Sequence, residues 1–137
     1  MDRIRVLIVD DHEAARRSLR STLSSSVKIE VVGESADGEE AVKRAGELRP
    51  DIVLLDISLP GISGIEAAKL IGKVSAQSRI IFVSQHDSVR IAKDALRVGA
   101  HGYVVKSDAG RDLVAAIEAA YGGQTFVSQT LVDRGMT

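Results

Sequence analysis

Short hydrophobic runs alternate along the chain with longer segments of helical spacing. Three of the runs are nearly continuous rather than alternating, which is typical of strands covered on both faces. Five runs are rich in β-branched residues and are predicted to be strands: Ile4–Val9, Ile29–Val32, Ile52–Leu55, Ile80–Val83 and Tyr103–Val105. The pattern therefore predicts a sheet whose central strands are buried between two layers.

Between these runs, hydrophobic residues recur every three or four positions, which predicts amphipathic helices. The clearest stripe consists of Leu113, Ala116, Ile117, Ala120 and Tyr121. Strands that alternate with helices predict a parallel sheet with right-handed crossovers, as in a doubly wound α/β sandwich. With five strands, we expect the flavodoxin-like order 2-1-3-4-5, with helices on both faces.

The helical pattern stops after Gly122-Gly123. We expect one domain over residues 1–123, and in residues 124–137 a tail or the start of a linker to an output domain. The apolar pair Phe126-Val127 either packs back on the last predicted helix or continues into that linker.

Composition narrows the class of protein. The chain has 137 residues, of which 45% are hydrophobic and 27% charged, as in a single soluble globular domain. It has no cysteine, which excludes disulfides, thiolate zinc sites and cysteine nucleophiles. No apolar run is long enough to span a membrane. A net charge of −1 and 3% aromatic residues argue against nucleic-acid binding by this chain alone.

Polar residues follow four of the five predicted strands. They are Asp10 and Asp11 after the first, Asp56 after the third, Ser84 after the fourth and Lys106 after the fifth. The second strand ends near Glu34, but as an edge strand it is expected to lie away from the crevice. Because ligands of open α/β sheets bind at the carboxyl ends of the strands, this topology predicts three carboxylates, a hydroxyl and a lysine on one rim.

This combination suits phosphoryl transfer. Three neighbouring carboxylates repel one another unless a hard cation such as Mg²⁺ neutralises them. A carboxylate can itself attack phosphorus and form an aspartyl phosphate. The metal, the lysine and the hydroxyl would then each neutralise or hydrogen-bond one phosphoryl oxygen. Taken singly, Asp11 could be a helix N-cap, Ser84 a turn residue and Lys106 a solvated side chain.

The residues around these positions resemble the receiver domain of bacterial two-component response regulators. The matching segments are Leu7-Ile8-Val9-Asp10-Asp11-His12, Asp51 to Gly61 followed by Gly64, Ile81-Phe82-Val83-Ser84 and Gly102-Tyr103-Val104-Val105-Lys106. Within that family, residues 36–41 and 99–108 are most similar to receivers of LuxR/FixJ-type (NarL-like) transcription factors. The resemblance covers residues 4 to 123.

The resemblance implies a role for each matched position. Asp56 would be the phosphoacceptor. Mg²⁺ or Mn²⁺ would be bound by Asp10, Asp11, Asp56 and the backbone carbonyl of Ser58. Ser84 and Lys106 would bind the phosphoryl group, and Tyr103 would be the aromatic switch that turns inward when Ser84 moves. Tyr103 could instead be a plain core aromatic.

Three residues are candidates for tuning access to the phosphoryl pocket: Ser58, Gln85 and His86. For His86, an exposed loop residue is an equally good interpretation. Gln85 stands where small or thioether residues are common in the family. Ser107 stands where a proline often follows the lysine.

The implied function is a phosphorylation-dependent switch, without enzymatic activity beyond self-phosphorylation and autodephosphorylation. The expected partners are a sensor histidine kinase, an output domain on the same or another chain, and a second copy of the chain on phosphorylation. A cytoplasmic location is also implied. We expect a receiver cut from a longer transcription factor, with a stand-alone receiver or phosphorelay module as the alternative.

Three other classes fit less well. A metal-dependent phosphohydrolase usually needs a second Asp two residues after the nucleophile, where this chain has Ser58. A flavin-binding module would need a phosphate-cradling loop after the first strand, and Asp10-Asp11-His12-Glu13 would repel the phosphate. A pseudo-receiver would be expected to lack one of the key residues, and none is missing.

Overall fold

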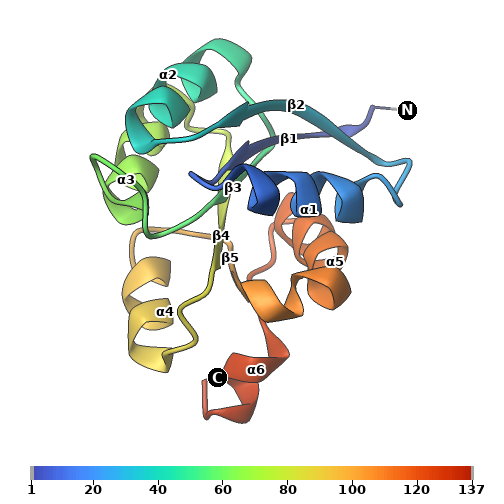
Figure 1. The fold of residues 1–137 in the computed structure, drawn as a ribbon, viewed down its shortest axis with the longest axis vertical. Coiled ribbons are helices and arrows are strands. Elements are labelled where there is room, and N and C mark those ends of the chain that lie inside the picture. Colours follow the sequence, from blue (N-terminus) through green and yellow to red (C-terminus); the bar gives the residue numbers. More distant parts are fainter. Residues whose placement is uncertain (1, 137) are drawn as a thin grey trace.

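A parallel sheet runs through the centre of the molecule, with helices on both of its faces (Figure 1). The computed structural model describes residues 2–136. The strand order is β2-β1-β3-β4-β5-β6, and every neighbouring pair is parallel. The strands are β1 Ile4–Val9, β2 Ile29–Ser35, β3 Ile52–Leu55, β4 Arg79–Ser84, β5 Gly102–Val105 and β6 Phe126–Val127. The predicted flavodoxin-like α/β class and the order of the first five strands are confirmed.

The predicted number of strands is wrong, because the sheet has six strands rather than five. The additional strand, β6, pairs with β5 through hydrogen bonds from the Phe126 amide to the His101 carbonyl and from the Ser128 amide to the Tyr103 carbonyl. It contains two residues. A strand this short has no alternation or run by which the sequence pattern could identify it.

Two layers of helices cover the sheet (Figure 1). α1 and α5 lie on one face, and α2, α3 and α4 lie on the other. The helices are α1 Glu13–Leu23, α2 Gly38–Leu48, α3 Gly64–Val74, α4 Val89–Leu96, α5 Ala109–Tyr121 and α6 Gln129–Asp133, with a 3-10 turn, η1, at Lys106–Asp108. Among the helices of residues 2–136, none is both long and apolar enough to cross a bilayer.

Side-chain caps begin three of these helices where the sequence places good N-cap residues. Asp37, Ser63 and Ser88 each accept a hydrogen bond from a backbone amide in the first turn. Such a bond satisfies one of the amide donors that a helix start leaves unpaired. These caps fix where the helices begin, and therefore how long the loops after β2, β3 and β4 are.

The central strands β1, β3, β4 and β5 are buried on both faces, and the described residues form two hydrophobic cores. One lies under α2, α3 and α4 and includes Phe82 and Tyr103. The other lies under α1 and α5 and includes Ile8, Leu54 and Ile117. This double burial explains why β1, β3 and β4 read as nearly continuous hydrophobic runs.

The segment after α5 folds back on the body of the domain. The fully buried Ser128 accepts a hydrogen bond of 2.9 Å from the Val105 amide through its hydroxyl. Leu131 and Met136 are buried in the core that contains Tyr103. This packing explains the apolar character of a segment that otherwise resembles a hydrophilic tail.

Gly64 brings the β3–α3 loop close to the end of β3. A Cβ atom at this position would lie 2.0 Å from the carbonyl oxygen of Asp56, a distance that no side chain tolerates. The Gly64 amide also donates to the Ile57 carbonyl at 2.8 Å. The expectation that Gly64 lets this loop meet its helix closely is confirmed, and the close approach shapes the loop around Asp56.

Candidate functional site

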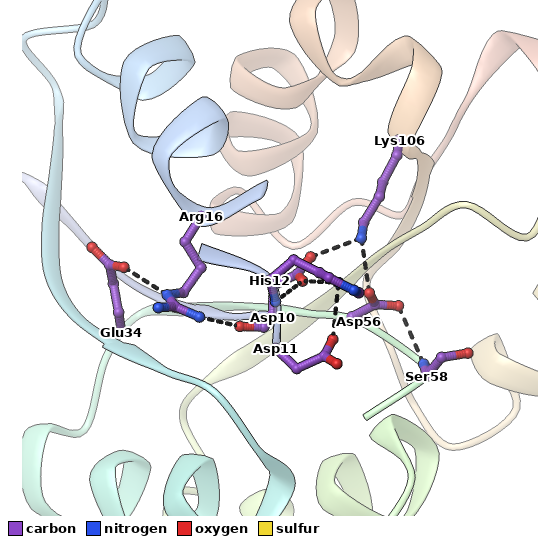
Figure 2. A network of polar contacts seen from close by, with 8 residues as sticks. All are labelled: Asp10, Asp11, His12, Arg16, Glu34, Asp56, Ser58 and Lys106. Carbon is purple, nitrogen blue, oxygen red and sulfur yellow. Dashed lines mark hydrogen bonds and ion pairs between the residues drawn. The ribbon is translucent and has the colours of Figure 1, made fainter. Parts of the chain in front are cut away.

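Two buried carboxylates and a lysine meet at the carboxyl edge of the sheet. Asp10 follows β1 and Asp56 follows β3, and these residues are only 1% and 4% exposed. The Lys106 ammonium, carried at the end of β5, lies 2.8 Å from Asp10 Oδ2 and 2.9 Å from Asp56 Oδ2 (Figure 2). The predicted convergence of these three strand ends is therefore present.

Lys106 is held in its charged form by this arrangement. Burial lowers the pKa of Lys106, but hydrogen bonds to Asp10 and Asp56 and the negative charges of both carboxylates outweigh that effect. The net result is a pKa above the ordinary lysine value. The site therefore keeps an ammonium directed at both carboxylates over the physiological pH range.

Asp11 and His12 complete the turn after β1. The His12 amide donates to Asp10 Oδ1 at 2.9 Å, and Nδ1 of the His12 ring lies 3.2 Å from Asp11 Oδ1. The N-cap position of α1 is His12, which makes no side-chain cap. The alternative that Asp11 serves as the N-cap of this helix is therefore wrong. The partly exposed carboxylate of Asp11 lies in the same turn as Asp10 (Figure 2).

The acidic turn offers oxygen ligands to a cation. Ligand atoms of Asp10, Asp11 and His12 lie within 4.8 Å of one another. A surface pocket of about 410 Å³ next to them is lined by Asp56, Ser58 and Lys106, among others. Carboxylate oxygens beside an open pocket fit a hard divalent cation that keeps several of its waters.

The β3–α3 loop begins with a bond to the buried Asp56. The Ser58 amide donates to Asp56 Oδ1 at 3.2 Å. Because Oδ2 accepts from Lys106, both oxygens of the Asp56 carboxylate are oriented by the protein. An oriented, buried carboxylate at the base of a pocket is well placed for attack on an incoming electrophile.

His86 connects the remaining predicted residues. Its ring Nε2 lies 2.9 Å from the Ser58 hydroxyl, and its amide donates to the Ser84 hydroxyl at 3.2 Å. Its carbonyl accepts a hydrogen bond of 2.8 Å from the Tyr103 hydroxyl. Ser84 and Tyr103 are both fully buried, whereas Gln85 is exposed and lines the pocket.

Tyr103 points inward in this structure. Burial raises the pKa of Tyr103, the Ser84 hydroxyl lowers it, and the negative charges of Asp56 and Asp87 raise it further, so that it lies above the ordinary tyrosine value. Its ring is tilted against Phe82 with centroids 6.4 Å apart. The phenol is therefore a neutral hydrogen-bond donor that ties β5 to the β4–α4 loop.

The sequence interpretation missed Arg16 and Glu34. Arg16 Nη1 donates to the backbone carbonyl of Asp10 at 2.6 Å, and its Nε donates to Glu34 Oε1 at 2.9 Å (Figure 2). Glu34 was expected to lie away from the crevice, yet it reaches the site through this arginine. The predicted adjacency of β2 and β1 places Glu34 near Asp10, but no feature of the sequence indicates that Arg16 connects the two.

Comparisons with known proteins agree on one family. The family model of the response regulator receiver domain matches residues 6–118. The response regulator UvrY of Escherichia coli K12 is 37% identical over 96% of this chain and 60% of its own length. A LuxR-family two-component response regulator from Aurantimonas sp. SI85-9A1 superposes with a TM-score of 0.91 at 36% identity, covering 96% of this chain and 94% of that one.

A more distant structure is described for its DNA interaction. The RcsB response regulator of Salmonella typhimurium is 26% identical, with a TM-score of 0.90 over 97% of this chain and 67% of that one. The present chain spans about 60% of the length of the curated relatives it matches.

Proposed function

Because the chain belongs to the receiver domain family of response regulators, we propose that it is a switch that accepts a phosphoryl group on Asp56. One observation carries the assignment of the site: the Lys106 ammonium lies between the buried carboxylates of Asp10 and Asp56. Of these two, Asp56 borders the open pocket together with Ser58 and Lys106. It is therefore the carboxylate that a phosphodonor can reach.

A divalent cation, Mg²⁺ or Mn²⁺, would be held by the carboxylates of Asp10, Asp11 and Asp56 and by the backbone carbonyl of Ser58. When bound, it would supply positive charge against the phosphoryl oxygens. The chemistry of the donor set supports this proposal, since all four groups offer oxygen. Lys106 supplies only one of the positive charges that three carboxylates require.

The proposed reaction is transfer from a phosphohistidine of a sensor kinase. A carboxylate oxygen of Asp56 attacks phosphorus, the P–N bond breaks, and its electron pair stays on the imidazole nitrogen, which takes up a proton. Lys106 neutralises charge on the phosphoryl oxygens, and the Ser84 hydroxyl donates to one of them once it turns toward Asp56. Hydrolysis by water would reverse the modification.

The conformational response would pass through the residues joined to His86. Turning the Ser84 hydroxyl toward the phosphoryl group removes the acceptor of the His86 amide. The β4–α4 loop would then rearrange, and with it the His86 carbonyl that holds the Tyr103 hydroxyl. Phosphorylation would in this way bias two arrangements of the loop and of the face formed by α4, β5 and α5.

We further propose that the switch controls transcription through an output domain. The similarity to a LuxR-family regulator and to RcsB supports this. Residues 1–123 would be the receiver, and residues 124–137, which include β6 and Leu131 packed against it, would lead into the output domain. A second copy of the chain, bound on phosphorylation, is a further proposed partner.

Mass spectrometry after incubation with acetyl phosphate and Mg²⁺ tests the phosphoacceptor. The intact mass should rise by one phosphoryl group, and only when a divalent cation is present. Asp56→Asn should abolish the labelling, whereas the exposed control Asp94→Asn on α4 should retain it. Undiminished labelling of the Asp56→Asn protein at the same peptide would refute the assignment.

A further inference from the structure

We propose that Arg16 is a positioning residue of the cation site, which fixes the turn carrying Asp10 and Asp11 while Glu34 holds its guanidinium in place. The inference rests on the proposed function, because it concerns the cation that would serve phosphorylation of Asp56. It adds a residue outside the pocket that determines how well the acidic turn binds that cation.

The argument starts with the hydrogen bonds of Asp10. Its amide donates to the Ser35 carbonyl at 3.1 Å, its Oδ1 accepts from the His12 amide, and its Oδ2 faces Lys106. The Asp10 carbonyl accepts a hydrogen bond of 2.6 Å from Arg16 Nη1. This carbonyl belongs to the peptide unit that leads into Asp11. This bond fixes the peptide plane between the two carboxylate-bearing residues, and therefore the relative direction of their side chains.

Arg16 is itself held in place. Its side chain is 17% exposed, and its Nε donates to Glu34 Oε1 at 2.9 Å. Glu34 lies on β2 beside Ile8 of β1 and also forms a close ion pair with Arg20. A planar guanidinium that binds a carboxylate with one edge and a carbonyl with another has little freedom to turn.

Electrostatics and geometry predict opposite effects when Arg16 is removed. Arg16 is a positive charge close to a cation site, so Coulomb repulsion alone predicts that an uncharged residue there tightens cation binding. If Arg16 positions the turn, its removal weakens binding instead, because the carboxylates lose their fixed spacing. The sign of the change therefore distinguishes the two effects.

Two substitutions separate charge from geometry. Arg16→Met removes the charge and both hydrogen bonds. Arg16→Lys keeps the charge, but a single ammonium cannot replace the planar fork that bridges Glu34 and the Asp10 carbonyl. Arg17→Met is the matched control, because the neighbouring Arg17 is 67% exposed and its ion pair within the described residues is with Glu13 on the same helix.

The experiment titrates each variant of the 137-residue chain with Mn²⁺ and follows free Mn²⁺ by electron paramagnetic resonance, with Mg²⁺ as competitor and without any phosphodonor. Arg16→Met should raise the Kd about tenfold, as is typical for residues that orient metal ligands. Arg16→Lys should raise it about threefold or more on the same grounds. Arg17→Met should leave it within about twofold, since an exposed charge is largely screened.

Glu34→Gln tests whether Glu34 acts through Arg16. In the wild-type background it should raise the Kd, both because Arg16 becomes mobile and because a negative charge is lost. In the Arg16→Met background only the small charge effect remains, so the second substitution should change the Kd less than twofold. An equal effect of Glu34→Gln in both backgrounds would show that Glu34 acts by charge alone and would overturn this part of the proposal.

The outcomes separate this proposal from the function it rests on. If the wild-type chain binds no Mn²⁺, the proposed function and this inference both fail. If the wild type binds and Arg16→Met and Arg16→Lys bind equally well or more tightly, the positioning role alone is wrong. Melting temperatures are recorded for every variant, and if Arg16→Met does not fold, the charge-conserving Arg16→Lys variant decides.

Discussion

The two sides of the pocket are held together by different kinds of contact. On the acidic side, Asp10, Asp56, Lys106 and Arg16 are joined by charged hydrogen bonds that connect β1, β3, β5 and α1. On the switch side, neutral hydrogen bonds converge on a single loop residue, His86. Charge-assisted bonds are roughly twice as strong as neutral ones.

This difference in hydrogen bonding predicts a different role for each side of the pocket. The acidic side is anchored at the ends of three buried strands, so its geometry is set before any ligand arrives. The switch side depends on Ser84, His86 and Tyr103, whose bonds each contribute about 1 kcal/mol and exchange easily. We therefore expect the acidic side to keep its geometry on phosphorylation while the β4–α4 loop of the switch side rearranges.

Substitution of Lys106 should have the largest effect on the acidic side. Lys106→Met leaves the carboxylates of Asp10 and Asp56 facing each other without an ammonium, and it removes a charge that would stabilise the transferred phosphoryl group. We expect the rate of phosphorylation by acetyl phosphate to fall about 100-fold. Intact-mass time courses measure this rate.

The exposed Lys93→Met on α4 is the control for that experiment and should phosphorylate at the wild-type rate. Phosphorylation of Lys106→Met within about twofold of wild type would mean that the contacts between Lys106 and the two carboxylates are structural only.

Ser84 should have the largest effect on the switch side. Ser84→Ala removes the fully buried hydroxyl that accepts from the His86 amide but leaves the acidic side intact. We expect phosphorylation to continue within about tenfold of the wild-type rate, since removing one hydrogen bond costs about 1 kcal/mol. The conformational response to beryllofluoride, followed by amide NMR shifts along residues 85–97, should disappear.

Ser84→Thr keeps a hydroxyl at this position and should retain the NMR response. If the spectral change in Ser84→Ala matches that of the wild type, Ser84 does not transmit the signal, and the contrast between the two sides of the pocket loses its basis.

The sequence predictions succeeded for residues at strand ends and failed for contacts that depend on the reach of a long side chain. Asp10, Asp56 and Lys106 could be brought together because each directly follows a buried hydrophobic strand, and parallel topology places such positions on one edge. Arg16 and Glu34 could not, because their contact depends on a long side chain crossing between a helix and an edge strand. Hydrophobic periodicity carries no information about such a reach.

The contacts of His86 and the strand β6 also could not be predicted from the hydrophobic pattern. Two of the three His86 contacts use its backbone amide and carbonyl, which any residue would offer. β6 contains two residues, too few to show a period. Both features depend on the three-dimensional arrangement of the β4–α4 loop and of the sheet edge at β5.

His86→Ala should have a smaller effect, because it removes only the ring contact with the Ser58 hydroxyl and leaves both backbone contacts in place. Without this contact, we expect water to enter the pocket more easily past Ser58, which lines it. We expect the aspartyl phosphate to hydrolyse about threefold faster, the change that corresponds to the loss of one exposed hydrogen bond. Decay of the phosphorylated mass after removal of the donor measures this, and an unchanged lifetime would show that the His86 ring does not shield the pocket.

The smallest expected effect lies at Tyr103 and appears most clearly at alkaline pH. The pKa values of Tyr103 and Lys106 are both raised in the folded chain, from the ordinary values of 10.0 and 10.5. A raised pKa stabilises the fold below the unfolded value, and that contribution is lost as pH rises through the folded value. Urea unfolding should therefore show a decreasing free energy of unfolding above about pH 10.

Tyr103→Phe separates the two contributions. At pH 8 it should lower the free energy of unfolding by about 1 kcal/mol, because the hydrogen bond from the phenol to the His86 carbonyl is lost. Above pH 10 the variant should lose stability less steeply than the wild type, since of these two groups Lys106 alone remains to bind its proton more tightly in the folded state. Parallel curves for the two proteins would mean that Tyr103 ionises as easily in the fold as in the unfolded chain, and that the switch side does not hold its phenol neutral.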